Sequence, residues 1–145
     1  DDVKAELKFW FDNIDSYNKS ALFEKAVFNK FVFSDSSDSG CGGYIYNMSN
    51  TEVHRAFTSE ESKTSSTNRE LLGVKTVLES VPHLLKGQSI KWFTDNQAVV
   101  HIVEHGSMKL HFHELALRIF SLCVKNSIKL YVEWIPRSLN EKAVI

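Results

Sequence analysis

The sequence predicts an α/β domain in which a mixed five-stranded sheet carries helices on both faces. Three short apolar runs follow one another with tight turns between them, and helical and strand-like segments then alternate to the end of the chain. The first pattern is typical of an antiparallel meander, and the second adds strands joined through helices. A chain of 145 residues with 43% hydrophobic residues is expected to form one globular unit with a buried core.

The N-terminal half is predicted to contain one helix and the meander. Apolar residues at helical spacing predict an amphipathic helix over residues 2–15, whereas residues 16–29 give no clear signal. The three strands are predicted at residues 31–33, 44–46 and 53–57. Residues 34–43 are rich in Ser, Asp and Gly and are interpreted as a turn, and the Ser/Thr-rich residues 58–67 are interpreted as a loop.

Helices and strands alternate in the C-terminal half. A helix is predicted over residues 67–81, ended by Pro82, because apolar residues recur at i, i+3, i+7 and i+10 from Leu71. The further predicted elements are a strand at 89–94, a helix at 96–105 stopped by Gly106, a helix at 108–122, a strand at 128–134 closed by Pro136, and a helix from Asn140.

Composition limits the possible functions. The formal net charge of −1 lacks the strong positive balance of proteins that hold nucleic acid tightly by themselves, although residues 107–145 carry 3 acids against 6 bases. No run approaches the roughly 20 apolar residues of a membrane helix, and the N-terminus lacks a signal-peptide pattern. Two cysteines fit a reducing compartment. We therefore expect a soluble intracellular protein, cytoplasmic or nuclear, with no membrane partner.

Three acidic residues stand at the ends of predicted elements. Asp35 follows the first strand, Glu70 lies in the first turn of the helix after the meander, and Asp95 ends the fourth strand. If the first and fourth strands are parallel neighbours, Asp35 and Asp95 meet at their carboxyl ends. Clustered carboxylates repel one another unless a hard cation neutralises them, so this placement predicts magnesium.

Each acid also has a purely structural interpretation. Thr67 followed by Glu70 forms a possible capping box, Asp95 before a helix is a possible N-cap, and Asp35 and Asp38 suit a turn. The joint placement of the three acids favours the metal site.

Five sequence motifs together resemble a known family. They are residues 33–43 (FSDSSDSGCGG), 65–71 (SSTNREL), 93–99 (FTDNQAV), 133–137 (EWIPR) and 140–143 (NEKA). In this order they resemble the ribonuclease H domain that follows reverse transcriptase in long-terminal-repeat and DIRS-like retroelements. The resemblance implies a ribonuclease H-like domain over residues 29–145. Residues 1–28 resemble the helical connection that leads out of the polymerase.

The resemblance implies a metal-dependent endonuclease that cleaves the RNA strand of RNA–DNA hybrids during reverse transcription. Asp35, Glu70 and Asp95 occupy the family's first three acid positions, and the resemblance implies that they are catalytic and hold two Mg²⁺ or Mn²⁺ ions. The reverse transcriptase domain of the same polyprotein is the implied protein partner. The residues expected to contact the hybrid are Ser36, Ser37, Asn96, Gln97, Arg137 and Asn140.

The sequence departs from the family pattern at two places. Val144 stands where the pattern has the fourth acid, and Ile145 follows it with little of the expected helix. The family's loop histidine has no counterpart in residues 136–140, where Arg137 is expected to contact phosphate instead. Because an apolar side chain cannot hold a cation, activity is expected to be impaired. The alternative is an inactive ribonuclease H-fold module that binds nucleic acid or protein.

One further motif suggests different chemistry. His101, Glu104 and His105 fit the H-x-x-E-H pattern of inverted zinc proteases, and both histidines share one side of a predicted helix. The helix is short, and few residues follow that could supply a third ligand. The favoured interpretation is that both histidines lie on the solvent side, opposite Val99 and Ile102.

Overall fold

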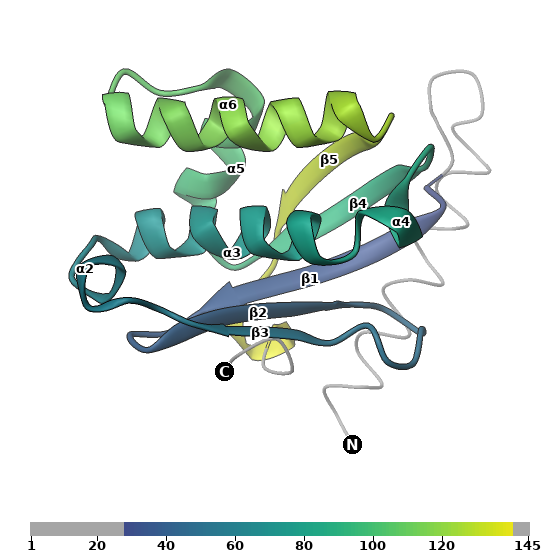
Figure 1. Ribbon diagram of the computed structural model, residues 1–145, viewed down its shortest axis with the longest axis horizontal. Helices are drawn as coiled ribbons and strands as arrows, with labels where there is room; N and C mark the ends of the chain where they lie inside the picture. The colour runs from purple at the N-terminus through teal and green to yellow at the C-terminus, as the bar shows by residue number, and fades with distance from the viewer. Residues whose placement is uncertain (1–27, 141–145) are drawn as a thin grey trace.

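Five strands form one mixed sheet in the computed structural model, which describes residues 28–140 (Figure 1). The strands are β1 Lys30–Ser36, β2 Gly40–Ile45, β3 Val53–Ala56, β4 Ser89–Thr94 and β5 Lys129–Trp134. The sheet order is β3-β2-β1-β4-β5. The pairs β1–β2 and β2–β3 are antiparallel, whereas β1–β4 and β4–β5 are parallel. The predicted α/β class, with its first three strands antiparallel, is confirmed.

Three helices lie on the same side of the sheet (Figure 1). They are α3 Ser66–Ser80, α5 Gln97–His105 and α6 Leu110–Lys125. Helix α3 crosses β1 and β2, α5 packs on β4 and β5, and α6 packs against α3 and α5. The short elements are α2 Ser59–Ser62, α4 Pro82–Leu85 and the 3-10 helix η1 Arg137–Leu139. The predicted helices on both faces are thus represented by α3, α5 and α6 on one face and, among the described elements, by the short η1 on the other, where it contributes Leu139.

Two apolar clusters hold these layers together. The larger lies between the sheet and the helices, and its fully buried side chains include Val32, Leu71, Leu78 and Trp92. The smaller lies on the opposite face and contains Phe33, Tyr44, Phe93 and Ile135. Successive residues Val32 and Phe33 enter different clusters because side chains alternate across a strand. No helix within residues 28–140 is both long and apolar enough to cross a membrane.

The predicted turn at residues 34–43 is wrong, because only residues 37–39 separate β1 from β2. The glycines in this stretch allow close packing instead of forming a wide turn. A Cβ atom on Gly43 would collide with the backbone carbonyl of Phe33 and the side chain of Val77. Strand β2 can therefore lie directly beneath α3.

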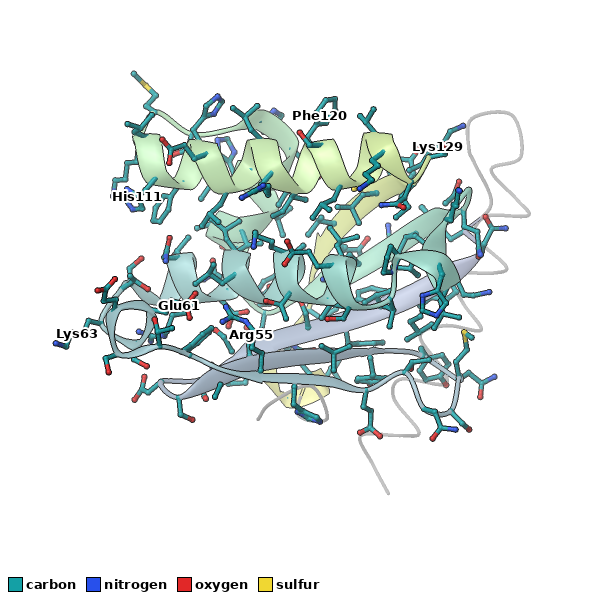
Figure 2. The ribbon with its side chains drawn as sticks, viewed as in Figure 1. Arg55, Glu61, Lys63, His111, Phe120 and Lys129 are labelled. Atoms are coloured by element: carbon teal, nitrogen blue, oxygen red, sulfur yellow. The ribbon has the colours of Figure 1, made fainter. Side chains whose placement is uncertain are left out.

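The predicted loop at residues 58–67 is also wrong, because it contains the one-turn helix α2. The Thr58 hydroxyl accepts from the Glu61 N–H, and the Glu61 carboxylate accepts from the Thr58 N–H, which completes a capping box. Arg55 donates to both oxygens of Glu61 at 3.1 Å. Figure 2 shows Arg55 of β3 and Glu61 side by side. The pattern Thr-x-x-Glu was the missed signal.

The remaining helix and strand boundaries agree closely with those predicted from the sequence, apart from the elements that the structure does not describe. Strand β4 matches the predicted residues 89–94, and α5 ends at Gly106, which has φ 77°. Pro82 begins the short helix α4 instead of only ending α3, and Met108 lies before α6. The predicted helix at 2–15, the connection at 1–28 except Phe28, and the helix after Asn140 fall outside residues 28–140.

Candidate metal centre

The three predicted acids meet at one end of the sheet. Asp35 is the second-last residue of β1, Asp95 directly follows β4, and Glu70 lies on α3, which crosses these strands. Because β1 and β4 are parallel neighbours, their carboxyl ends lie together. One carboxylate oxygen from each acid lies within 4.8 Å of the other two. The structure therefore brings Asp35, Glu70 and Asp95 together as the sequence predicted.

Asp35 and Glu70 are buried, with exposed fractions of 0% and 4%. The backbone N–H of Ser36 donates to Asp35 Oδ1 at 2.8 Å and to Glu70 Oε1 at 3.3 Å. Within residues 28–140, the other oxygens, Asp35 Oδ2 and Glu70 Oε2, are buried and accept no hydrogen bond from an N–H or hydroxyl group. Buried polar atoms are rarely left without a partner. A cation bound at the cluster would satisfy these two acceptor atoms.

The crowding of these acids changes their protonation. Burial, followed by the hydrogen bond and charge of Asp35 and the charge of Asp95, raises the pKa of Glu70 to about 9. Burial and the charge of Asp35 raise the pKa of Asp95, while the Arg137 guanidinium opposes that rise. Without a cation, Glu70 therefore holds a proton at neutral pH. A divalent ion would replace that proton and neutralise the cluster.

Asp95 is held from the other side by the last residue of β5, Trp134, and the first residue of η1, Arg137. The Nε of Arg137 donates to Asp95 Oδ2 at 3.2 Å, and the indole N–H of Trp134 donates to the Asp95 backbone carbonyl at 3.1 Å. The Asp95 side chain is 5% exposed, whereas the Arg137 side chain is 75% exposed. Arg137 therefore contacts the carboxyl cluster through Nε, while its remaining N–H groups are exposed to solvent and can bind an anion.

A buried polar network fixes β1 just before Asp35. The indole N–H of Trp92 donates to the Ser34 hydroxyl at 2.8 Å, and Asn140 Nδ2 donates to the Ser34 carbonyl at 2.9 Å. Ser34, Trp92 and Asn140 are each no more than 1% exposed. This network links β1, β4 and the segment after η1, and it orients the strand that carries Asp35.

Arg69 fixes the loops beside the carboxylates, a role that the sequence gave no signal for. Its guanidinium donates to the backbone carbonyls of Ser62 at 3.3 Å and Thr64 at 2.6 Å. It also donates to Asp38 Oδ1 at 3.3 Å, in the turn between β1 and β2. Arg69, which directly precedes Glu70 in the sequence, thereby joins that turn to the segment leading into α3.

The other residues that were predicted to contact the substrate lie around this site and differ in their solvent exposure. Ser36 is 7% exposed and Asn140 is 1% exposed, so their described contacts lie within the domain. Ser37 lies in the turn between β1 and β2, where its hydroxyl bonds to Gly40. Asn96 and Gln97 begin α5, directly after Asp95, and Gln97 is exposed.

The structural interpretations of Glu70 and Asp95 are wrong. Ser65 is the N-cap of α3, because its hydroxyl accepts from the Asn68 N–H, and Glu70 therefore lies beyond the first turn. Asn96 is the N-cap of α5, with its side chain accepting from the Val99 N–H. Neither acid is needed to cap a helix. Their burial next to Asp35 has to be explained by the site itself.

The residues at this site suit a hard divalent cation. Magnesium and manganese prefer oxygen ligands, and the cluster offers three carboxylates and two unpartnered buried oxygens. Within residues 28–140, no other group of three or more potential metal ligands comes together in this way. The histidines of the H-x-x-E-H pattern are exposed and lie away from it, as expected.

Comparisons with known proteins agree with this geometry. Residues 29–120, more than half of the chain, match the family model described as the RNase H-like domain found in reverse transcriptase. No curated protein matches the sequence.

Solved structures with the same fold include nucleases and a reverse transcriptase. RNase H1 from Halobacterium salinarum has a TM-score of 0.64 and 14% identity, over 79% of this chain and 90% of that chain. LC11-RNase H1, solved in complex with an RNA/DNA hybrid, has a TM-score of 0.66 and 15% identity, over 79% and 91%. A foamy viral protease-reverse transcriptase, in complex with double-stranded DNA, has a TM-score of 0.54 and 13% identity, over 73% and 20%. At these identities, the similarities establish the fold.

Proposed function

The chain belongs to the family of RNase H-like domains found in reverse transcriptase, and on this basis we propose that it cleaves the RNA strand of RNA–DNA hybrids in a metal-dependent reaction. The observation that carries the proposal is the buried carboxyl cluster of Asp35, Glu70 and Asp95, with its two unpartnered oxygens. Such an arrangement is costly unless a proton is taken up or a cation binds there, which points to a functional site.

We assign the carboxylates to metal binding, with Mg²⁺ or Mn²⁺ as the ion. When bound, a divalent cation supplies Lewis acidity that activates water and stabilises charge on the phosphate. Ser36 holds one oxygen of Asp35 and one of Glu70 through its N–H, so the other oxygen of each is presented to the ion. Asp95 supplies the third carboxylate, from the loop before α5.

Arg137 is the residue that we assign to the phosphate backbone of the substrate. Its side chain is 75% exposed beside the cluster, and the bond from Nε to Asp95 leaves both terminal nitrogens for an anion. We place further substrate contacts at the half-buried Ser37 and Asn96 and at the exposed Gln97. Ser36 and Asn140 support the site from within the domain.

The substrate is expected to be bound weakly and in a salt-sensitive manner. A net charge of −1 provides few phosphate contacts, so affinity should fall as counterions compete. The 2′-hydroxyl groups of the RNA strand distinguish a hybrid from duplex DNA. We propose that the reverse transcriptase domain of the same polyprotein supplies additional affinity through residues 1–28; the family match beginning at residue 29 supports this boundary.

An inactive binding module is the second candidate function. Val144, at the family's fourth acid position, cannot hold a second ion, and the Arg137 guanidinium already pairs with Asp95. In this case the domain would bind hybrids through the same surface without hydrolysis.

A cleavage assay separates the two functions. A hybrid with labelled RNA is incubated with the chain over a series of Mg²⁺ and Mn²⁺ concentrations, beside an Asp35→Asn variant and a Glu79→Gln control. Glu79 is a suitable control because it lies on α3 with Glu70 but is exposed and away from the cluster. We expect cleavage that Asp35→Asn abolishes and Glu79→Gln retains. Hybrid binding without cleavage at any metal concentration would instead establish the binding module.

A further inference from the structure

Helix α5 carries two histidines and a glutamate that the nuclease site does not use. Val99 and Ile102 of this helix are 0% and 6% exposed and face the core. His101 and His105 are exposed, and the side chains of Glu104 and His105 are 50% and 62% exposed. The helix therefore presents His101, Glu104 and His105 to solvent, in positions i, i+3 and i+4.

The two imidazoles already have the separation that a shared ion needs. The ring centroids of His101 and His105 are 4.8 Å apart. Two imidazoles bound to one tetrahedral zinc ion, with Zn–N bonds of about 2.1 Å, have ring centroids about 5 Å apart. Glu104 Oε2 lies 3.7 Å from His105 Nε2, so a carboxylate is adjacent to the pair.

We propose that His101 and His105, with Glu104 beside them, form a second cation site that binds Zn²⁺ on the outer side of α5. Imidazole nitrogen is a preferred ligand of zinc and other borderline transition-metal ions, whereas magnesium prefers oxygen. The two histidine nitrogens leave the remaining coordination positions to water, because Glu104 does not come together with both histidines as a third ligand. The site thus selects a different class of cation from the carboxyl cluster.

The two sites are separate although they lie in one stretch of chain. His101 and His105 follow Asp95 by 6 and 10 residues. At about 1.5 Å of rise per residue, an ion on α5 is on the order of 10 to 15 Å from the carboxylates. Occupation of one site therefore does not require the other, and the zinc site does not depend on the proposed nuclease activity.

Zinc bound here would join residues on successive turns near the end of α5. Gly106, with φ 77°, stops the helix directly after His105 and leads towards α6. Because the ion binds both histidines only when this turn is helical, it should stabilise the folded protein and protect the last amides of α5 from exchange.

The test is a titration of the full chain with ZnCl₂, followed by calorimetry and by thermal unfolding. Single His101→Gln and His105→Gln variants should each weaken zinc binding at least tenfold and remove the rise in melting temperature. His111→Gln is the matched control, because His111 is an exposed histidine at the N-terminal end of α6 (Figure 2). An Asp35→Asn variant tests whether zinc binds the carboxyl cluster instead.

The proposal requires zinc binding that His111→Gln and Asp35→Asn both retain. Zinc affinity that is unchanged in His101→Gln or His105→Gln overturns it, as does the absence of stoichiometric binding in the unmodified chain. Binding that is lost in Asp35→Asn but kept in His101→Gln would assign the zinc to the carboxylates and also overturn the proposal. Amide exchange in α5, measured with and without zinc, checks the location directly.

Discussion

Replacing Glu70 by glutamine tests the carboxyl cluster in the absence of metal. Burial, followed by the contacts with Asp35, raises the pKa of Glu70 from 4.5 to about 9. Between these values the folded protein keeps a proton that the unfolded chain has released. The free energy of unfolding therefore falls as pH rises from 4.5 towards 9. At about 1.4 kcal/mol per pH unit, the loss between pH 4.5 and 7 is on the order of 3 kcal/mol.

The Glu70→Gln variant has no such proton to release. Its stability relative to the unmodified chain should therefore increase by about 3 kcal/mol from pH 4.5 to 7. Urea unfolding in EDTA over this pH range measures the difference, with Glu79→Gln as the control. Glu79 is a suitable control because it lies on the same helix but its side chain is 44% exposed and paired with Lys75 at the surface. If the free energy of unfolding varies with pH in the same way for Glu70→Gln and the unmodified chain, the reasoning is refuted.

Three further substitutions address residues around the cluster. Asn140→Ala leaves the buried Ser34 carbonyl without its partner, and should destabilise the protein by about 1 to 3 kcal/mol in urea unfolding with little change in hybrid affinity. Arg137→Gln should weaken hybrid binding and reduce its slope against log salt by about 1, whereas an unchanged slope would exclude a phosphate contact. Val144→Asp should raise hybrid cleavage by roughly two to four powers of ten, and equal rates would show that the fourth acid is dispensable.

Much of the fold follows from local patterns in the sequence. Strand β4 was predicted at its observed residues, because turn-forming residues flank a short apolar run there. Helix α3 was predicted because its apolar residues recur at helical spacing, and Leu71, Val74 and Leu78 are buried as expected. Gly106 ended α5 as predicted, since a positive φ favours glycine.

The errors arose where tertiary contacts override local preference. Residues 34–43 have the composition of a turn, but glycine there meets the requirement for close packing beneath α3. Helix α2 has a local signal in the Thr58–Glu61 capping box, but the Arg55–Glu61 pair that joins it to β3 is a tertiary contact. A sequence pattern that is read locally contains neither this pair nor the packing of Gly43.

The site was predicted in part for a similar reason. Asp35 and Asp95 could be placed together because the order of parallel strands determines which ends meet. Glu70, on α3, was grouped with them through the resemblance to the family. The Ser36 N–H that bonds to two carboxylates, and the Arg69 contacts with Asp38 and Thr64, depend on loop geometry that spacing does not specify.

The binding of a divalent cation by the three carboxylates is the central claim. Calorimetric titration of Mn²⁺ into the full chain at neutral pH, in buffers with different ionisation enthalpies, tests it most directly. We predict one or more sites at the cluster, with proton release as the ion replaces the proton on Glu70. A triple variant, Asp35→Asn with Glu70→Gln and Asp95→Asn, should lose both the binding and the proton release. Equal Mn²⁺ binding by the triple variant and the unmodified chain would contradict the account.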